Sequence, residues 1–384
     1  WAPFFSGGLG VNIHNYEFLK GNEMVNKLKV RASYGRTGKA SFPAYAATTM
    51  YEALFDEWYA TGFGAVLKAL GNNNLTWEKT DKFNVGIEMQ FLNRRLTVDA
   101  DYYHDKTIDL VNDVSLSQTS GFSSYKDNMG EVLNQGFELQ VRGEVFRNRD
   151  WLVALWGNMA HNKNKILKIS DSQRAYNQRV KEFYENIVNE EYGRYNSKYG
   201  VPISQYEEGQ SLTSIWAVKS LGIDPTTGKE IFLNRDGSVS DTWNATQEVA
   251  VGNTEPKFNG SIGFNAAYKQ WSLFAAFQYE WGGQEYNQTL VDRVENARIQ
   301  YQNVDLRVLT DRWKQPGDIA QFKDIKNADS ATMPTSRFVQ DKAYLRLSAL
   351  TLSYDFNREW IKKYLGMNML RLEASTRDFI NWNS

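Results

Sequence analysis

Residues Lys82–Asp105 read KFNVGIEMQFLNRRLTVDADYYHD and alternate between apolar and polar side chains on both sides of a polar turn, Asn93–Arg95. The apolar positions before the turn are Phe83, Val85, Ile87, Met89 and Phe91, and those after it are Leu96, Val98, Ala100 and Tyr102. A period of two indicates a β-strand with one apolar face, so the stretch predicts a hairpin. What covers that face, whether a core, a second sheet or lipid, decides the fold.

The composition excludes several classes of protein. The chain has 384 residues with 44 Lys+Arg against 45 Asp+Glu, so no basic excess is available for a nucleic-acid partner. Cysteine is absent, which excludes disulfides and thiolate metal sites. The three histidines, His14, His104 and His161, lie far apart in the sequence and are expected at solvated or turn positions. We predict neither a metal site nor a cofactor.

Aromatic residues are unusually abundant, with 12 Trp, 21 Tyr and 21 Phe, although the mean hydropathy is only −0.56. No run approaches the ~18 apolar residues of a transmembrane helix. A chain that is aromatic-rich, hydrophilic on average and full of alternation is typical of a membrane β-barrel, in which only half of each strand must be apolar.

Strand candidates recur in pairs that are joined alternately by short and long connections. Besides the opening hairpin, the pairs are Pro3–Ile13 with Lys27–Arg36, Glu131–Phe146 with Asp150–Asn162, Phe258–Tyr268 with Trp271–Trp281, and Tyr344–Phe356 with Asn368–Thr376. Among the short connections, Tyr16–Asn26 has a helical pattern, and Arg358–Leu365 is a short basic amphipathic segment. The long connections are Gly38–Trp77, Asp105–Asn128, Leu167–Gly252 and Gly282–Arg337. Short turns on one side and long loops on the other indicate an outer-membrane barrel.

The longest connection, Leu167–Gly252, is expected to be a large extracellular loop insertion with structure of its own. The sequence predicts a helix over Ser172–Tyr199 and short strands at Ser214–Leu221 and Glu230–Leu233. Asp236–Asp241 resembles part of a calcium loop, but no Glu stands at the twelfth position to bind the ion in bidentate fashion. We therefore predict a hairpin turn at its Asp-Gly pair.

The strand pattern assigns roles to two sets of side chains. Residues of the polar faces are expected to line the lumen: Glu88, Asp99, Asp101, Glu138, Gln140, Arg142 and Glu144. Aromatic residues at the short-turn ends are expected to form a girdle at the membrane interface: Phe91, Phe146, Trp151, Tyr268, Trp271 and Phe356.

An ordered set of motifs resembles the barrel half of the SusC/RagA family of TonB-dependent outer-membrane transporters. The motifs are LTWEKTDKFNVG (Leu75–Gly86), NQGFEL (Asn134–Leu139), GIDPTTG (Gly222–Gly228), GNTEPKFNG (Gly252–Gly260) and Lys269–Gly283. The resemblance covers essentially the whole chain. It implies an all-β, antiparallel transmembrane β-barrel of 22 strands, of which about ten or eleven are expected in residues 1–384, together with long extracellular loops.

The resemblance also implies a mechanism and its partners. A SusD-like lipoprotein caps the barrel and captures an oligosaccharide or oligopeptide, and TonB opens the plug so that the cargo passes through the outer membrane. The plug, the TonB box and the first strands are expected upstream of Trp1, and a terminal strand is expected beyond Ser384. The chain is thus interpreted as the C-terminal portion of one barrel domain in contact with outer-membrane lipid. No catalysis is expected of it.

Loop aromatic residues are candidates for stacking on sugar rings or clasping peptides, although each also suits packing between loops. They are Tyr45, Tyr51, Trp58, Tyr59, Phe122, Tyr125, Trp243, Trp281 and Tyr286. The alternative is a soluble extracellular β-sandwich that binds or cleaves glycans, with its apolar faces buried between two sheets. Asp99 and Asp101 are spaced like a glycosidase pair, but an alternating polar face produces that spacing without catalysis.

Overall fold

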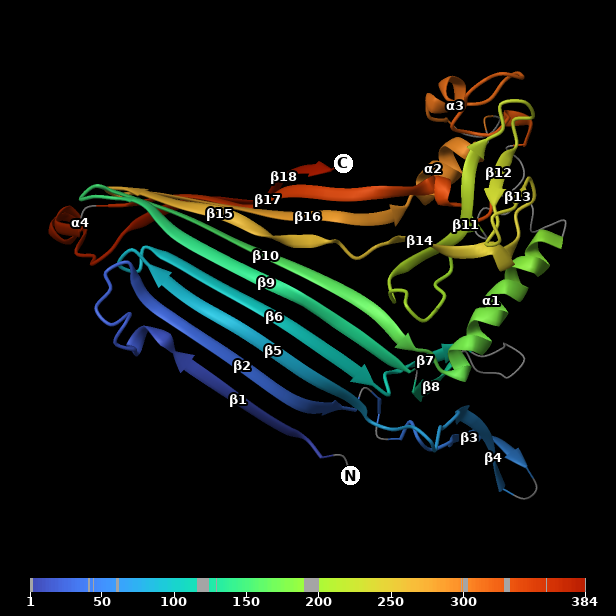
Figure 1. Cartoon of the computed structure of the whole chain (residues 1–384), viewed down its shortest axis with the longest axis horizontal. Helices are drawn as coiled ribbons and strands as arrows, with labels where there is room; N and C mark the ends of the chain where they lie inside the picture. Colours follow the sequence, from blue (N-terminus) through green and yellow to red (C-terminus); the bar gives the residue numbers. More distant parts are fainter. Residues whose placement is uncertain are drawn as a thin grey trace.

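We describe a computed structural model of the chain (Figure 1), covering residues 3–40, 42–43, 45–59, 62–115, 124–128, 130–189, 200–297, 299, 303–327, 332–356 and 358–383. Its main feature is a ten-stranded sheet in the order β1-β2-β5-β6-β9-β10-β15-β16-β17-β18, with antiparallel neighbours throughout. The strands are β1 Phe5–Asn12, β2 Val25–Lys39, β5 Glu78–Phe91, β6 Leu96–Ile108, β9 Glu131–Arg147, β10 Trp151–Lys168, β15 Phe258–Tyr268, β16 Trp271–Tyr286, β17 Val339–Asp355 and β18 Arg371–Asn383. Each predicted strand is confirmed, and most extend further toward the long loops.

The short connections gather at one end of the sheet and the long ones at the other, as Figure 1 shows. The tightest hairpin joins β15 to β16 through two residues, Lys269 and Gln270. In the hairpin between β5 and β6, Leu92, Asn93 and Arg94 all adopt positive φ angles of 55°, 55° and 66°. The basic amphipathic segment Arg358–Leu365 forms helix α4, which joins β17 to β18. The helix expected at Tyr16–Asn26 is wrong: a 3-10 turn at Ile13–Asn15 is followed by turns that end at Gly21, whose φ of +80° cannot continue a helix.

The long connections carry small folded units. The first two contain hairpins that the sequence did not reveal, β3 (Met50–Tyr59) with β4 (Gly62–Ala69) and β7 (Val111–Ser115) with β8 (Ser124–Asn128). The third holds α1 (Asp171–Asn189) and a four-stranded sheet of β11 Ser214–Ile223, β12 Glu230–Leu233, β13 Val239–Ser240 and β14 Glu248–Asn253. The fourth holds the short helices α2 Gln288–Leu290, η6 Val291–Glu295 and α3 Arg307–Thr310.

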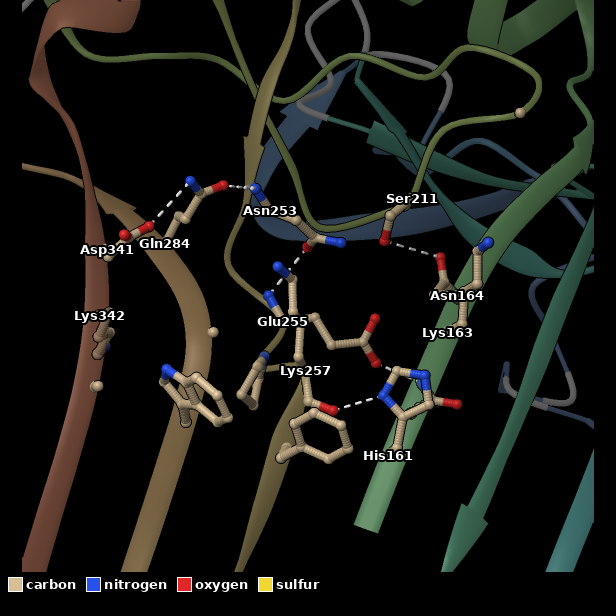
Figure 2. A pocket seen from close by; sticks show the side chains of 17 residues that line it. His161, Lys163, Asn164, Ser211, Asn253, Glu255, Lys257, Gln284, Asp341 and Lys342 are labelled. Carbon is tan, nitrogen blue, oxygen red and sulfur yellow. Dashed lines mark hydrogen bonds between the residues drawn. The ribbon is translucent and has the colours of Figure 1, made fainter.

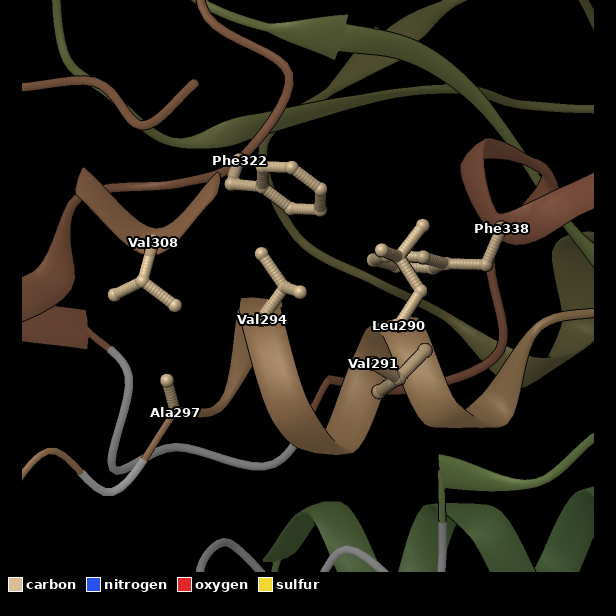
Figure 3. Packing of buried hydrophobic residues seen from close by; sticks show 7 residues of the cluster. All are labelled: Leu290, Val291, Val294, Ala297, Val308, Phe322 and Phe338. Atoms are coloured by element: carbon tan, nitrogen blue, oxygen red, sulfur yellow. The ribbon is translucent and has the colours of Figure 1, made fainter. Parts of the chain in front are cut away.

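Buried hydrophobic clusters lie in these loops. One is formed by Leu290, Val291, Val294, Ala297, Val308, Phe322 and Phe338 (Figure 3). A second joins Val180 and Tyr184 of α1 to Ala245. No helix among the described residues is long and apolar enough to cross a membrane. The loops are therefore organised by cores of their own.

Within the described residues, the apolar face of the ten-stranded sheet is not covered by other parts of the chain. Leu155, Ile262 and Leu352 lie within three of its strands, yet they are 50%, 48% and 44% exposed. No second sheet packs over these strands in the part of the chain that the structure describes. The alternative of a β-sandwich does not fit this sheet, because a sandwich buries this face between two sheets. Uncovered apolar strands of this length fit lipid.

Candidate functional site

The polar side chains of β5, β6 and β9 share one face of the sheet, because residues directly opposite in antiparallel strands point the same way. Glu88 lies opposite Asp99, which lies opposite Gln140, and Asp101 lies opposite Glu138. Arg142 and Glu144 continue the face toward the short turns, opposite Trp156 and Ala154 of β10. The structure thus brings together all seven side chains that were predicted to line the lumen. We refer to this surface as the polar face.

Basic residues of β2 neutralise part of the polar face. Lys27 Nζ lies 2.5 Å from a Glu88 carboxylate oxygen, and Lys29 Nζ lies 3.4 Å from the other. Arg31 Nη2 lies 2.7 Å from Asp101. Sequence reasoning missed these three partners, although the alternation Lys27-Leu28-Lys29-Val30-Arg31 was a usable signal. The result is a charged wall across adjacent strands, suited to polar solutes.

Two rows of aromatic rings border the apolar face. The row at the short-turn end contains the predicted girdle residues: Trp151 stands 4.5 Å from Tyr268, and Trp271 stands 4.8 Å from Tyr354, measured between ring centroids. Phe356 is 4.9 Å from Tyr354. Phe91 and Phe146 lie at the corresponding ends of β5 and β9. These positions match those of interfacial aromatic residues in membrane barrels.

The second row lies at the long-loop end and was not predicted. The rings of Phe137, His161 and Phe258 lie 5.4 to 6.4 Å apart, and Phe258 stacks on Trp281 at 6.1 Å. Trp281 stands ten residues after Trp271 on the same strand and therefore on the same face. Trp281 therefore extends the border of the apolar face, and its ring also lines a pocket at the long-loop end. Its role as a substrate contact stays a prediction.

The other predicted substrate contacts are divided between exposed positions and positions packed against the loop cores. Tyr45 and Tyr51 are exposed near β3. Trp243 and Tyr286 are partly buried against the loop cores instead, with Trp243 Nε1 donating to the Pro334 carbonyl at 2.8 Å and Tyr286 meeting Phe338 edge-on at 6.0 Å. These two rings therefore pack loops together. Phe122 and the side chains of Trp58, Tyr59 and Tyr125 lie outside the described residues.

A pocket of about 890 Å³ opens where β10 and β15 diverge at the long-loop end (Figure 2). Amide and charged side chains make up most of its polar lining. Asn162 donates to the Glu255 carboxylate, Ser211 donates to Asn164 at 3.3 Å, and Gln284 donates to Asp341 at 3.2 Å. Amides and carboxylates beside the ring of Trp281 offer both hydrogen bonds and a stacking surface to a small polar ligand.

A buried ion cluster joins the two longest connections. The Arg337 guanidinium lies 2.9 Å from Glu230 of β12 and 2.5 Å from Glu295 of η6. Thr335 Oγ1 also donates to Glu230, at 2.6 Å. Burial alone would lower the pKa of Arg337, but the two carboxylates raise it above its usual value. The cluster therefore fixes the third and fourth long connections to each other.

A buried carboxyl group lies within the four-stranded sheet. Burial raises the pKa of Glu248 to about 8, although the hydrogen bond that Gln205 donates to it acts in the opposite direction.

The calcium-like segment forms a turn, in which Asp236 Oδ1 accepts hydrogen bonds from the backbone N–H and the hydroxyl of Ser238 at 2.9 and 2.6 Å. Among the described residues, no three His, Asp or Glu side chains gather in a metal-binding group.

Comparisons with known proteins agree with this geometry. The profile of the family described as "TonB dependent receptor-like, beta-barrel" matches residues 4–375. TonB-dependent receptor P3 of Formosa agariphila is 26% identical over 389 residues, which cover 100% of this chain and 37% of that protein. TonB-dependent receptor SusC of Bacteroides thetaiotaomicron is 32% identical over 180 residues, which cover 44% of this chain and 18% of SusC.

Solved structures share the fold at low sequence identity. A structure of the RagAB peptide transporter superposes with a TM-score of 0.77 at 22% identity and covers 99% of this chain and 40% of that one. The same importer in its "open-open" state gives a TM-score of 0.76. The chain therefore spans about two fifths of the length of these solved structures.

Proposed function

Because this chain belongs to the TonB dependent receptor-like β-barrel family, we propose that it forms part of the wall and mouth of an outer-membrane importer. Barrels of this family lie in the outer membrane of Gram-negative bacteria, and this chain is placed there with them. The proposed activity is TonB-dependent import of oligosaccharides or oligopeptides, together with a SusD-like surface lipoprotein. No enzymatic step is part of the proposal.

One observation carries this proposal: a single ten-stranded sheet has an uncovered apolar face and a charged polar face. The first suits lipid and the second suits a water-filled lumen. The likeness to SusC and to the RagAB peptide transporter supports import of glycan or peptide cargo. On this reading, the loop units at the long-loop end supply the surface on which a lipoprotein cap docks.

Within this chain, the proposed roles follow the two faces. Glu88, Asp101 and their basic partners keep the wall hydrated beside the moving cargo. Tyr45 and Tyr51 remain proposed contacts for cargo, because their rings are exposed. The aromatic rows hold the barrel at the two membrane interfaces.

The test uses the intact native protein, extracted from membranes and run on a denaturing gel with and without boiling. A closed barrel resists unboiled detergent because each strand edge is paired, so a heat-dependent shift is expected. A lipoprotein is expected to co-purify, and deletion of the gene should abolish growth on the glycan or peptide that the pair imports. A protein found in the aqueous fraction without a heat-dependent shift would refute the proposal.

A further inference from the structure

Helix α4 lies at the short-turn end of the sheet (Figure 1). It carries exposed apolar and aromatic side chains. Ile361 is completely buried and fixes one face of the helix. Trp360 and Tyr364 stand one turn apart and are 48% and 64% exposed. Met369, in the segment that leads into β18, is 73% exposed. Import through the barrel gives these side chains no role.

The exposed rings of α4 continue the aromatic row that borders the apolar face. Phe356 is 4.9 Å from Tyr354 and 6.4 Å from Trp360, and Trp360 is 5.8 Å from Tyr364. The row therefore runs without a break from the strand ends of the sheet onto the helix. Because the row marks the membrane interface, this continuity places α4 in the same interface.

Two lysines complete the helix. Lys362 and Lys363 occupy its last turn, and Lys363 Nζ lies 5.3 Å from the Tyr364 ring centroid. Neither lysine forms an ion pair within the described residues, whereas nearby Arg371 is held by Asp355 at 2.6 Å. Lysines beside interfacial aromatic rings are placed to extend their ammonium groups to lipid phosphates.

We propose that α4 is an interfacial helix that binds anionic phospholipid head groups of the periplasmic leaflet. Trp360 and Tyr364 lie at the boundary between head groups and acyl chains, and Lys362 and Lys363 contact the phosphates. The inference rests on the apolar face of the sheet lying in a bilayer. Lipid binding by α4 does not depend on which cargo is imported, so it can be tested even if a transport assay with a given cargo fails.

The experiment reconstitutes the intact receptor in bilayers that contain lipids brominated near the head group. The signal of Trp360 is the difference in emission between the wild type and W360F. We expect brominated phosphatidylglycerol to quench this signal more strongly than brominated phosphatidylcholine. In K362Q/K363Q, the preference for phosphatidylglycerol should fall by up to about 5-fold for each lysine replaced.

The matched control is K314Q/K326Q, which removes two lysines from the long-loop end and should leave the preference unchanged. Native mass spectrometry of bound phosphatidylglycerol on the wild type and K362Q/K363Q provides a readout that needs no tryptophan substitution. Quenching of Trp360 by aqueous iodide but not by brominated lipid would overturn the proposal. Equal retention of phosphatidylglycerol by K362Q/K363Q and the wild type would also overturn it.

Discussion

At the scale of single residues, the long loops depend on charged groups that have been removed from water. Arg337 is surrounded by Glu230 and Glu295, which come from different connections. A buried charge that loses its partner is costly, whereas an exposed pair contributes little. The loops should therefore be sensitive to substitutions at the centre of this cluster and tolerant of substitutions at exposed ion pairs.

Arg337→Gln should destabilise the loop unit by about 3–5 kcal/mol, because it leaves two buried carboxylates without a counter-charge. The measurement is hydrogen exchange of β12 and η6 amides in the intact receptor. The control is Arg307→Gln, which removes a solvent-exposed partner of Asp305 and should leave exchange unchanged. Similar protection in Arg337→Gln and the wild type would show that the cluster does not hold the loops.

Glu248 makes the same region sensitive to pH. Its pKa of about 8 in the folded state lies above its ordinary value of 4.5, so the folded state binds the proton more tightly than the unfolded state does. The protonated Glu248 side chain therefore contributes its full share to the stability of this region below pH 4.5. That contribution, on the order of a few kcal/mol, is lost as the pH rises toward 8.

The check is the free energy of local opening of β14, obtained from hydrogen exchange in the intact receptor at a series of pH values and corrected for intrinsic exchange rates. Glu248→Gln keeps a neutral side chain at every pH and should remove the dependence between pH 5 and 8.5. A wild-type receptor whose β14 opens equally easily at both ends of that range would contradict the assignment.

At the scale of elements, the sequence predicted the strands well because alternation is a local property. The polar face followed directly, since even spacing along a strand fixes which side chains share a face. The hairpins β3–β4 and β7–β8 were not predicted, because their strands do not alternate regularly between apolar and polar side chains. The pocket beside Trp281 could not be predicted, because its lining comes from segments that lie far apart in the sequence.

The two faces of β9 should respond in opposite ways to the same new charge. Val141 lies on the apolar face opposite Val98, and Gln140 lies on the polar face opposite Asp99. Val141→Arg should destabilise the barrel by about 2–4 kcal/mol if it lies near the bilayer midplane. Gln140→Arg should be tolerated, because it gains water and a carboxylate neighbour.

The measurement is the denaturant midpoint of the intact receptor in lipid vesicles, with the heat-dependent gel shift as a test of assembly. Both variants place Arg at adjacent positions of the same strand, so a difference in their stability does not come from the intrinsic strand propensity of Arg. Equal losses in both variants would show that the apolar face does not contact lipid.

At the scale of the whole molecule, the third and fourth long connections behave structurally as one unit. The N–H of Val218 donates to the Pro334 carbonyl at 3.1 Å, and the N–H of Ser220 donates to the Ser336 hydroxyl at 2.9 Å. Trp313 Nε1 reaches back to the Pro225 carbonyl at 2.8 Å. None of these contacts could be predicted from the sequence, because each joins residues more than 80 positions apart and at least one partner in each lies outside the β-strands and α-helices.

Phe338→Ala tests whether this unit opens as a whole. Phe338 is completely buried in the cluster of Figure 3, so its truncation should cost about 3–5 kcal/mol. Because the connections share hydrogen bonds and the Arg337 cluster, hydrogen exchange should accelerate in β11 and β14 as well as around Phe338, while the separate β3–β4 hairpin keeps its rate. Leu309→Ala, an exposed leucine of the same connection, is the matched control and should change neither region. Acceleration confined to residues 287–338 would show that the two connections open independently, and a cap that docks on both would then bind a jointed surface rather than a rigid one.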